Sequence, residues 1–507
     1  MPDPILLWNE VSLEANRVSH TNGRGEQVGP PLSARALAIV HLAMYDAYAG
    51  VINDPSTLPR YTDPAVVPLG IVPSDDATAA LAVAGAAYQS LVKLFPSQMP
   101  FFDAVLDGAG DRTQAAHAFG VTVANAILEY RKDDPGSGSV TYKPSPARGK
   151  HRPDPDSPNQ GFHAPDYGKL SKGFAITKRW AIAPPPLDDG EYRNALHQVR
   201  GKGIRPDLMG TVLQDDQLRT PDETLVGLFW GYDGSAEIGT PPRFYNQIVR
   251  RVALKRNNTV AQNAAMFAFL NAALADAGIL AWEQKYIHEL WRPVVGIREH
   301  DPSMGPLPQQ ASDTLADDCD PQWLPLGAPN SNRAGKNSTP NFPSYPSGHA
   351  TFGAAAFHVT RLFYGEGGSY SETANTLSAD TLCDDVAFVS EELNGITTDN
   401  TGAARPRHLR KFPEGLFQMI VENGRSRVFL GVHWVFDAFA VTGANEPNLS
   451  RLEGGKRVGG VPLGLLIAED IFQSGNKLAP KKPPVAVIAP AAAAEARPPT
   501  FGSSFLR

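Results

Sequence analysis

Two cations seven residues apart are the first candidates for chemistry. Lys285 and Arg292 lie in the stretch KYIHELWRP, and a spacing near two helical turns places both on one face of a helix. Two neighbouring cations repel each other unless an anion lies between them, so the pair indicates an anion site. The alternative is a solvated charged stripe, because Glu283 and Glu289 are close in sequence.

The second stretch, PSGH, has the character of a helix start. Ser347 offers a hydroxyl, Gly348 lets a backbone N–H approach a ligand without a Cβ in the way, and His349 can act as an acid or a base. A helix start also carries unpaired N–H groups and the positive end of the helix dipole, which favour an anion. A plain serine N-cap followed by glycine is the alternative interpretation.

The third stretch, SRVFLGVHWVFD, contributes Arg427, His433 and Asp437. Because Asp437 follows His433 by four residues, on a helix its carboxylate can hold the imidazole and leave one ring nitrogen free. Such a nitrogen can bind a metal-like centre or attack phosphorus, and an arginine fork suits a tetrahedral oxyanion. The alternative is an interhelical salt bridge beside a packed histidine.

Helical periodicity dominates the segments that must position these residues. We expect helices near residues 30–51, 75–95, 112–132, 261–293, 347–365 and 413–443. Ser33 is the expected N-cap of the first, and Pro293 is expected to end the fourth. Alternating strand patterns are scarce, so we predict a mainly α, helical-bundle protein. Two long Pro/Gly-rich loops, residues 133–190 and 301–346, should build or cover the mouth of a site.

Composition limits the partners of the protein. The 507 residues are 42% hydrophobic and 20% charged, and the net charge of −7 argues against nucleic acid or an anionic membrane as a partner. No apolar run reaches the roughly 18 residues that a membrane helix needs, and the first residues are too acidic and too briefly apolar for a signal peptide. We expect a soluble protein without a transmembrane segment. Its compartment stays open, export by a non-classical route included.

The chain reads as one domain followed by a tail. We expect a single helical domain over residues 1–474, whereas residues 475–507 are rich in Pro and Ala, cannot bury a core and should be disordered. The two cysteines, Cys319 and Cys383, can form one bridge or remain free thiols.

In chain order the three stretches form a composite signature: Lys-x6-Arg-Pro, Pro-Ser-Gly-His and Ser-Arg-x5-His-x3-Asp. This signature resembles the superfamily that unites type 2 phosphatidic acid phosphatases, bacterial class A acid phosphatases and vanadium-dependent haloperoxidases. The resemblance to the vanadium chloroperoxidase type extends through LLWNEVSLEANRVSHT, PPLSARALAIVHLAMYDAY, LFWGYDGSAEIGTPPRFYNQIVRR and GGVPLGLLIAEDIF to nearly the whole chain. It implies two four-helix bundles packed together, with a vanadate-binding core at about residues 225–445.

The resemblance also implies a role for each residue of the signature. The residues that would contact the oxygens of a vanadate cofactor are Lys285, Arg292, Ser347, Gly348 and Arg427. His433 would be the single protein ligand to vanadium, and His349 the acid–base group.

Residues around this pocket also match the family. Asp233, in GYDGS, would pair with the pocket arginines, and Asp437 would hold His433. Trp282 and Phe342 would line the halide side of the pocket, and algal bromoperoxidases carry histidine where Phe342 stands. An apolar wall there keeps water out and strengthens electrostatic interactions inside the site.

The function that the resemblance implies is the oxidation of chloride and bromide by hydrogen peroxide. The product, hypohalous acid, would halogenate an organic acceptor, and the mechanism would be non-redox Lewis-acid catalysis through a peroxovanadate, polarised by Lys285. One alternative is an acid phosphatase in which His433 becomes a phosphohistidine. A phosphatase has no evident need for the aromatic pair of Trp282 and Phe342. The other is a non-catalytic oxyanion-binding protein, which needs no acid–base histidine. Whether the protein is a monomer or a homo-oligomer stays open.

Overall fold

The fold is described from a computed structural model of the chain. It describes residues 3–63, 66–67, 74–109, 112–138, 142–186, 189–212, 216–299 and 319–474. The tail at residues 475–507, for which we expected disorder, lies outside these ranges.

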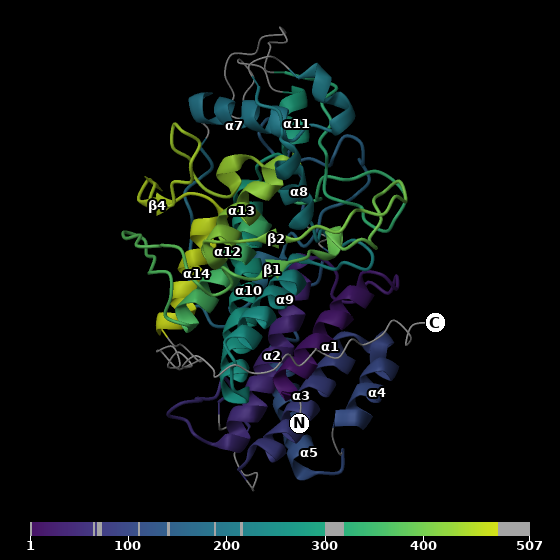
Figure 1. Ribbon diagram of the computed structural model, residues 1–507, viewed down its shortest axis with the longest axis vertical. Helices are drawn as coiled ribbons and strands as arrows, with labels where there is room; N and C mark the ends of the chain where they lie inside the picture. Colours follow the sequence, from purple (N-terminus) through teal and green to yellow (C-terminus); the bar gives the residue numbers. More distant parts are fainter. Residues whose placement is uncertain are drawn as a thin grey trace.

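Helices dominate the described residues (Figure 1). The first five are α1 (Pro4–Ser19), α2 (Pro30–Ile52), α3 (Asp76–Leu94), α4 (Met99–Ala109) and α5 (Ala115–Tyr130). The next six are α6 (Tyr167–Leu170), α7 (Asp189–Lys202), α8 (Pro221–Phe229), α9 (Pro241–Lys255), α10 (Val260–His288) and α11 (Pro293–Glu299). The last three are α12 (Gly348–Phe363), α13 (Gly415–Phe429) and α14 (Gly460–Ser474).

The other regular elements are short. The 3-10 helices are η1 (Pro96–Gln98), η2 (Pro206–Thr211), η3 (Glu391–Leu393) and η4 (Val435–Asp437). Within the described ranges the strands form two antiparallel pairs, β1 (Ala387–Phe388) with β2 (Arg410–Lys411) and β3 (Leu452–Glu453) with β4 (Lys456–Arg457). The prediction of a mainly α protein is confirmed.

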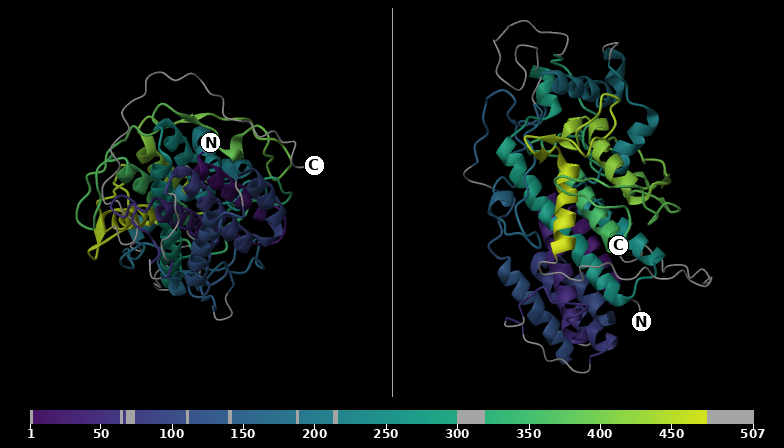
Figure 2. Two further views of the ribbon diagram at one scale, coloured as in Figure 1. Left: turned by 90° about the horizontal axis from the view of Figure 1, so that it is seen from below. Right: turned by 90° about the vertical axis from the view of Figure 1, so that its left-hand side faces the viewer.

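The helices pack as two groups along the long axis of the molecule. Helices α1, α2, α3 and α5 form the N-terminal group, and α10, α12, α13 and α14 form the second (Figures 1 and 2). Helix α10 packs on α2 as well as on α12, so it joins the two groups. This arrangement agrees with the expected pair of four-helix bundles.

Helix α10 is apolar all round over the stretch from residue 263 to residue 282, where every residue is buried. A capping box between Thr259 and Gln262 fixes its start. By length and composition α2, α3 and α10 could each cross a membrane, so the expectation that no segment is long and apolar enough is wrong. The apolar window of α10 is entirely buried inside the protein, and that burial accounts for its hydropathy.

Two expected helix boundaries differ from the structure. Ser33 does not cap α2: Gly29 precedes the helix, and the Ser33 N–H already donates to the Gly29 carbonyl at 3.0 Å. Pro293 does not end α10, which stops at His288 because Glu289 adopts a left-handed φ of 53°. Pro293 instead begins α11, since a first-turn proline needs no N–H partner.

The expected helix at residues 413–443 is only half helical. Helix α13 ends at Phe429, and Gly431 follows with a φ of 73°, the left-handed conformation that terminates many helices. The chain then turns into η4, so His433 lies in a turn and not on an α-helix.

The two Pro/Gly-rich loops lie where the prediction put them. The described parts of both contribute to the wall of the main cavity, through Gln160 and His163 from the first loop and residues 328–342 from the second. Residues 301–318 lie outside the described ranges. In the described part of the chain Cys319 and Cys383 form no disulfide, which settles the alternative left by the sequence.

Candidate functional site

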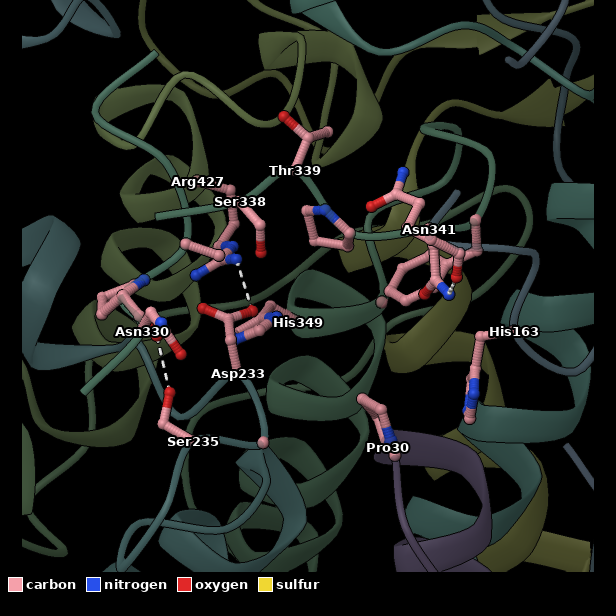
Figure 3. Close-up of a pocket in the computed structure, with 18 of the residues that line it drawn as sticks. Pro30, His163, Asp233, Ser235, Asn330, Ser338, Thr339, Asn341, His349 and Arg427 are labelled. Carbon is pink, nitrogen blue, oxygen red and sulfur yellow. Dashed lines mark hydrogen bonds and ion pairs between the residues drawn. The ribbon is translucent and has the colours of Figure 1, made fainter. Parts of the chain in front are cut away.

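Three distant segments meet at one cavity of about 330 Å³. Lys285 comes from the last turn of α10, Ser347 caps the start of α12, and Arg427 lies in the last turn of α13. Gly348, His349, Arg427 and His433 are among the residues that line the cavity, whereas Lys285, Arg292 and Ser347 are not. Figure 3 shows Arg427, Asp233 and His349 on one side and Pro30 and His163 on the other.

Two buried arginines have donors that no described protein group satisfies. Arg292 donates through Nε to the Phe342 carbonyl at 2.9 Å and through Nη1 to the Val432 carbonyl at 2.7 Å, but its Nη2 has no partner in the described ranges. Arg427 donates through Nη2 to Asp233, and its Nε and Nη1 likewise find no described partner. Unpaired guanidinium N–H groups are costly to bury. They are therefore suited to a ligand with several acceptor oxygens.

His433 is held in one tautomer. Its Nδ1 lies 2.7 Å from Asp437 Oδ2, so Nδ1–H donates to the carboxylate and Nε2 keeps its lone pair. Arg292 Nη1 lies 2.9 Å from that Nε2 and donates to it. The expected contact between His433 and Asp437 is present, although a turn makes it and not the expected helix.

Electrostatics keep the His433 ring neutral. Burial lowers the pKa of His433 well below 6.5, and the charges of Arg292 and Lys285 lower it further. Burial raises the pKa of Asp437 to about 7, against the opposing effects of the Ser344 hydrogen bond and the Lys285 charge. A neutral imidazole with an unprotonated Nε2 is the form that binds a metal centre, once Arg292 releases that nitrogen.

The ammonium group of Lys285 is held by a cage of three backbone carbonyls. Its Nζ lies 2.8, 2.9 and 2.6 Å from the carbonyl oxygens of Pro343, Ser344 and Pro346. Burial and the neighbouring Arg292 lower the pKa of Lys285, whereas three acceptors favour the ammonium form. All three ammonium protons are therefore engaged by the loop that leads into α12.

The spacing argument for Lys285 and Arg292 was wrong in its geometry. Helix α10 ends between them, so they do not share a helix face. Arg292 nevertheless reaches the same place, because both side chains hydrogen-bond to the 342–346 loop.

The start of α12 combines an N-cap with an open backbone. The Ser347 hydroxyl accepts the Ala350 N–H at 3.4 Å, so the plain N-cap interpretation holds, and its own proton can still be donated to a ligand. A Cβ at Gly348 would lie 3.2 Å from Trp282 Cζ3, so glycine also permits close packing on that indole. The first N–H groups of α12 and the helix dipole face an anion favourably.

His349 is anchored to the turn before α9. Its Nε2 lies 2.7 Å from the Gly231 carbonyl, which fixes the proton on Nε2 and leaves Nδ1 as the acceptor. Burial, followed by the Arg427 charge, lowers the pKa of His349 well below 6.5. A buried neutral imidazole at the cavity wall can accept a proton from a bound ligand.

Asp233 pairs with Arg427 at 2.8 Å, as expected (Figure 3). Burial raises the pKa of Asp233, and the Arg427 charge opposes that shift. Its second oxygen, Oδ2, has no partner among the described residues. Asp233 and Asp437 are two carboxylates beside three cations, namely Lys285, Arg292 and Arg427. The cluster therefore retains positive charge that favours an anion.

Trp282 and Phe342 form an aromatic wall, with ring centroids 4.8 Å apart. The Lys285 Nζ lies 5.1 Å and the Arg292 Cζ 4.9 Å from the Phe342 ring centroid, so the wall also contacts the cations. His163, which sequence analysis missed, completes it: its ring centroid lies 6.3 Å from that of each aromatic.

Other contributors also escaped sequence analysis. Ser344 donates to Asp437 and lies only three residues before Ser347, so the motif itself offered a signal. The sequence offered only weak signals for the other two: His163 lies in a loop predicted to form the mouth of the site, and Gly231 lies two residues before Asp233. His358 pairs with Glu469 between α12 and α14, away from the cavity lining.

The donor set fits an oxyanion better than a bare metal ion. Within the described ranges no three His, Cys, Asp or Glu side chains gather at one point. Three guanidinium nitrogens without partners and one imidazole lone pair suit a vanadate, which offers several oxygens and one metal bond. The fold and site thus define a helical-bundle protein with an oxyanion pocket.

Comparison with known proteins gives the particular family. Family models described as VCPO second helical-bundle domain and vanadium chloroperoxidase N-terminal domain match residues 265–444 and 3–161. The chain is 34% identical to the vanadium chloroperoxidase of Curvularia inaequalis, over 94% of this chain and 90% of that protein. The chain therefore belongs to the vanadium chloroperoxidase family, and the resemblance inferred from the sequence is confirmed.

Solved structures share the fold. A bacterial vanadium-dependent iodoperoxidase aligns with a TM-score of 0.61 at 19% identity, covering 93% of this chain and 97% of that one. A holo-type bacterial vanadium-dependent chloroperoxidase aligns with a TM-score of 0.59 at 14% identity, covering 88% and 93%. At these identities the likeness supports the helical architecture.

Proposed function

We propose that the protein is a vanadium-dependent haloperoxidase that binds vanadate in this cavity and oxidises chloride and bromide. Family membership supports peroxide-dependent halide oxidation with vanadate as cofactor. The observation that carries the assignment to this cavity is the group of unpartnered donors, Arg292 Nη2 and Arg427 Nε and Nη1, beside the Nε2 lone pair of His433.

The residues that would hold the cofactor divide into two kinds. His433 would bind vanadium through Nε2, since its Nδ1–H is already committed to Asp437. The vanadate oxygens would be held by Arg292, Ser347, Gly348 and Arg427, and by Lys285 once one of its N–H groups leaves its carbonyl acceptor. Bound vanadate would supply a Lewis acid that activates hydrogen peroxide toward a halide without changing its own oxidation state.

His349 is the proton carrier in this proposal. Its Nε2–H remains hydrogen-bonded to the Gly231 carbonyl, and its Nδ1 accepts a proton from hydrogen peroxide. The same nitrogen can return that proton to the leaving oxygen, so that peroxide, halide and one further proton give hypohalous acid and water. A ring that is neutral at neutral pH starts this cycle in the correct state.

Lys285 has no N–H group free for a ligand, so its first role is to hold a loop in place. Its three contacts to Pro343, Ser344 and Pro346 fix the loop that delivers Ser347 and Gly348 to the cavity. The resemblance implies a hydrogen bond from Lys285 to a peroxide oxygen. For that bond to form, one ammonium N–H must break its hydrogen bond to a backbone carbonyl. Its positive charge polarises the ligand at short range in either case.

The halide would approach along the wall of Trp282 and Phe342. Two aromatic faces exclude water there, and the nearby Lys285 and Arg292 attract a small anion. Bromide should react faster than chloride because it is the better reductant.

The decisive experiment is a reconstitution. Metal-stripped protein is assayed for halogenation of an organic acceptor with peroxide and either bromide or chloride, before and after vanadate is added. We expect activity only with vanadate, with bromide faster, and inhibition by phosphate, which competes for the same donors. Phosphate-ester hydrolysis without any vanadate-dependent halide oxidation would instead support the phosphatase alternative.

A further inference from the structure

One short turn supplies two contacts of the site. The Gly231 carbonyl accepts from His349 Nε2 at 2.7 Å, and Asp233 accepts from Arg427 Nη2 at 2.8 Å. Between them Tyr232 has a φ of 49°, a left-handed conformation that residues with a side chain rarely adopt. Such a turn persists only where its surroundings enforce it.

The side chain of Tyr232 is clamped from two directions. Its ring stacks on Phe244, with centroids 4.3 Å apart and an interplanar angle of 5°. Its hydroxyl accepts the Glu391 N–H at 3.0 Å. These contacts fix the side chain, but they do not reach the peptide groups that point toward the site.

The backbone of the turn rests on the buried carboxylate of Glu392. Its Oε1 accepts the Tyr232 N–H at 3.4 Å, and a Cβ at Gly231 would lie only 3.0 Å from the same oxygen. The Glu392 side chain is fully buried. Burying a carboxylate costs free energy unless other groups pair with it or donate hydrogen bonds to it.

Two further groups hold that carboxylate in place. Arg405 Nη1 and the Ser331 hydroxyl donate to Glu392 Oε2 at 2.7 and 2.5 Å. The Ser331 N–H donates to the Ser235 hydroxyl at 3.3 Å, which joins the cluster to the cavity wall just after Asp233. The cluster of Glu392, Arg405 and Ser331 thus lies directly behind the turn.

We propose that Glu392, held by Arg405 and Ser331, is a positioning residue that orients His349 and Arg427 through the 231–233 turn. The inference rests on the proposed function insofar as those two residues serve halide oxidation. Glu392 itself touches neither ligand nor substrate. The alternative is a buried ion pair that contributes only to stability.

The test compares Glu392→Gln with Asp380→Asn. The control removes the charge from another fully buried pair, Arg361 Nε to Asp380 Oδ2 at 3.0 Å, at the far end of α12. We expect Glu392→Gln to lower kcat for bromide oxidation about 10-fold with KM for bromide within twofold, whereas Asp380→Asn lowers Tm but leaves kcat within twofold.

A second readout needs no cofactor. In vanadate-free protein the hydrogen-bonded Nε2–H of His349 should give a slowly exchanging NMR signal, assigned by its loss in His349→Ala. We expect this signal to shift or exchange faster in Glu392→Gln and to stay unchanged in Asp380→Asn. If both variants keep the signal and the same kcat, Glu392 is merely structural and the proposal is overturned.

A milder variant covers the case in which Glu392→Gln does not fold. Ser331→Ala removes one hydrogen bond to the same carboxylate, and we expect a twofold to fivefold fall in kcat with the same change in the His349 signal. An unchanged signal and kcat in Ser331→Ala would then overturn the proposal. If the wild-type protein shows no vanadate-dependent oxidation, the proposed function fails, while the NMR comparison still decides whether Glu392 orients His349.

Discussion

Arg292 donates through Nη1 to Nε2 of His433, with 2.9 Å between the two nitrogens. The contact identifies Nε2 as an acceptor, because a guanidinium has no lone pair to offer. The opposite ring nitrogen donates to Asp437 at 2.7 Å, so the imidazole is set in the form that binds a metal before any ligand arrives. Arg292 also has an unpartnered Nη2 in the described structure, so it can turn toward an anion at the cost of one hydrogen bond.

Removing the charge of Asp437 should weaken the cofactor site without removing its ligand. In Asp437→Asn the amide holds the His433 ring less firmly and no longer favours the Nδ1–H tautomer. We expect vanadate affinity to fall by roughly 10- to 100-fold, the usual effect of losing a partner behind a metal-bound histidine. Equilibrium dialysis measures this, with Asp380→Asn as a control that keeps wild-type affinity.

Anion binding should stabilise the folded protein. Phosphate or vanadate at 100 times its dissociation constant adds about 2.7 kcal/mol to the free energy of unfolding, which raises Tm. Arg427→Gln removes two of the unpartnered donors and should abolish most of that rise. Arg425→Gln lies on the same helix, removes an exposed ion pair with Glu446 and should retain it. Equal responses from the two variants in a thermal-shift assay would place the anion elsewhere.

The sequence predicted which residues gather in the candidate site better than how they are positioned there. The types and order of Lys285, Arg292, Arg427 and His433 carried the chemistry, and the helical periodicity around them predicted the bundle. The ends of the helices were harder to predict. Helix α10 ends because Glu289 adopts a left-handed conformation, which its tertiary surroundings impose and its local sequence does not favour.

Contacts between distant segments that the resemblance did not cover could not be predicted. Glu392 lies 160 residues from Tyr232, and no pattern within the 390–393 segment distinguishes its carboxylate from a surface one. The carbonyl cage of Lys285 is equally hidden, because it uses backbone atoms, which have no sequence signature. Such partners are visible only once the fold brings them together.

Lys285 should contribute to stability as well as activity. Lys285→Met fills most of the space but leaves three carbonyl oxygens without their donor. We expect the free energy of unfolding to fall by about 3 kcal/mol, since each buried acceptor left unsatisfied carries a penalty. Lys255→Met, which removes a surface pair with Asp385, should cost less than about 1 kcal/mol. Urea unfolding compares them, and equal losses would show that the cage does not stabilise the loop.

Buried neutral histidines should make stability depend on pH. Burial lowers the pKa of His41 to about 4, so between pH 6.5 and 4 the unfolded chain binds a proton that the folded one does not. The free energy of unfolding therefore falls with pH in this window, and His41 alone accounts for about 2 kcal/mol of the loss between pH 7 and 5. Urea unfolding of His41→Gln at both pH values should show a loss smaller by that amount. An identical loss in both proteins would mean that His41 is not buried neutral.

His349 should separate catalysis from binding. In His349→Ala the donors of Arg292 and Arg427 and the Nε2 of His433 remain, so vanadate should bind within a few-fold of wild-type affinity. Halide oxidation should fall about 10²- to 10⁴-fold, the usual contribution of a positioned acid–base group. Added imidazole should restore part of the rate, because the small molecule can occupy the vacated space and accept the proton. A variant that binds vanadate and still turns over at the wild-type rate would show that the proton leaves by another route. A variant that has lost vanadate would instead make His349 part of the anion site itself.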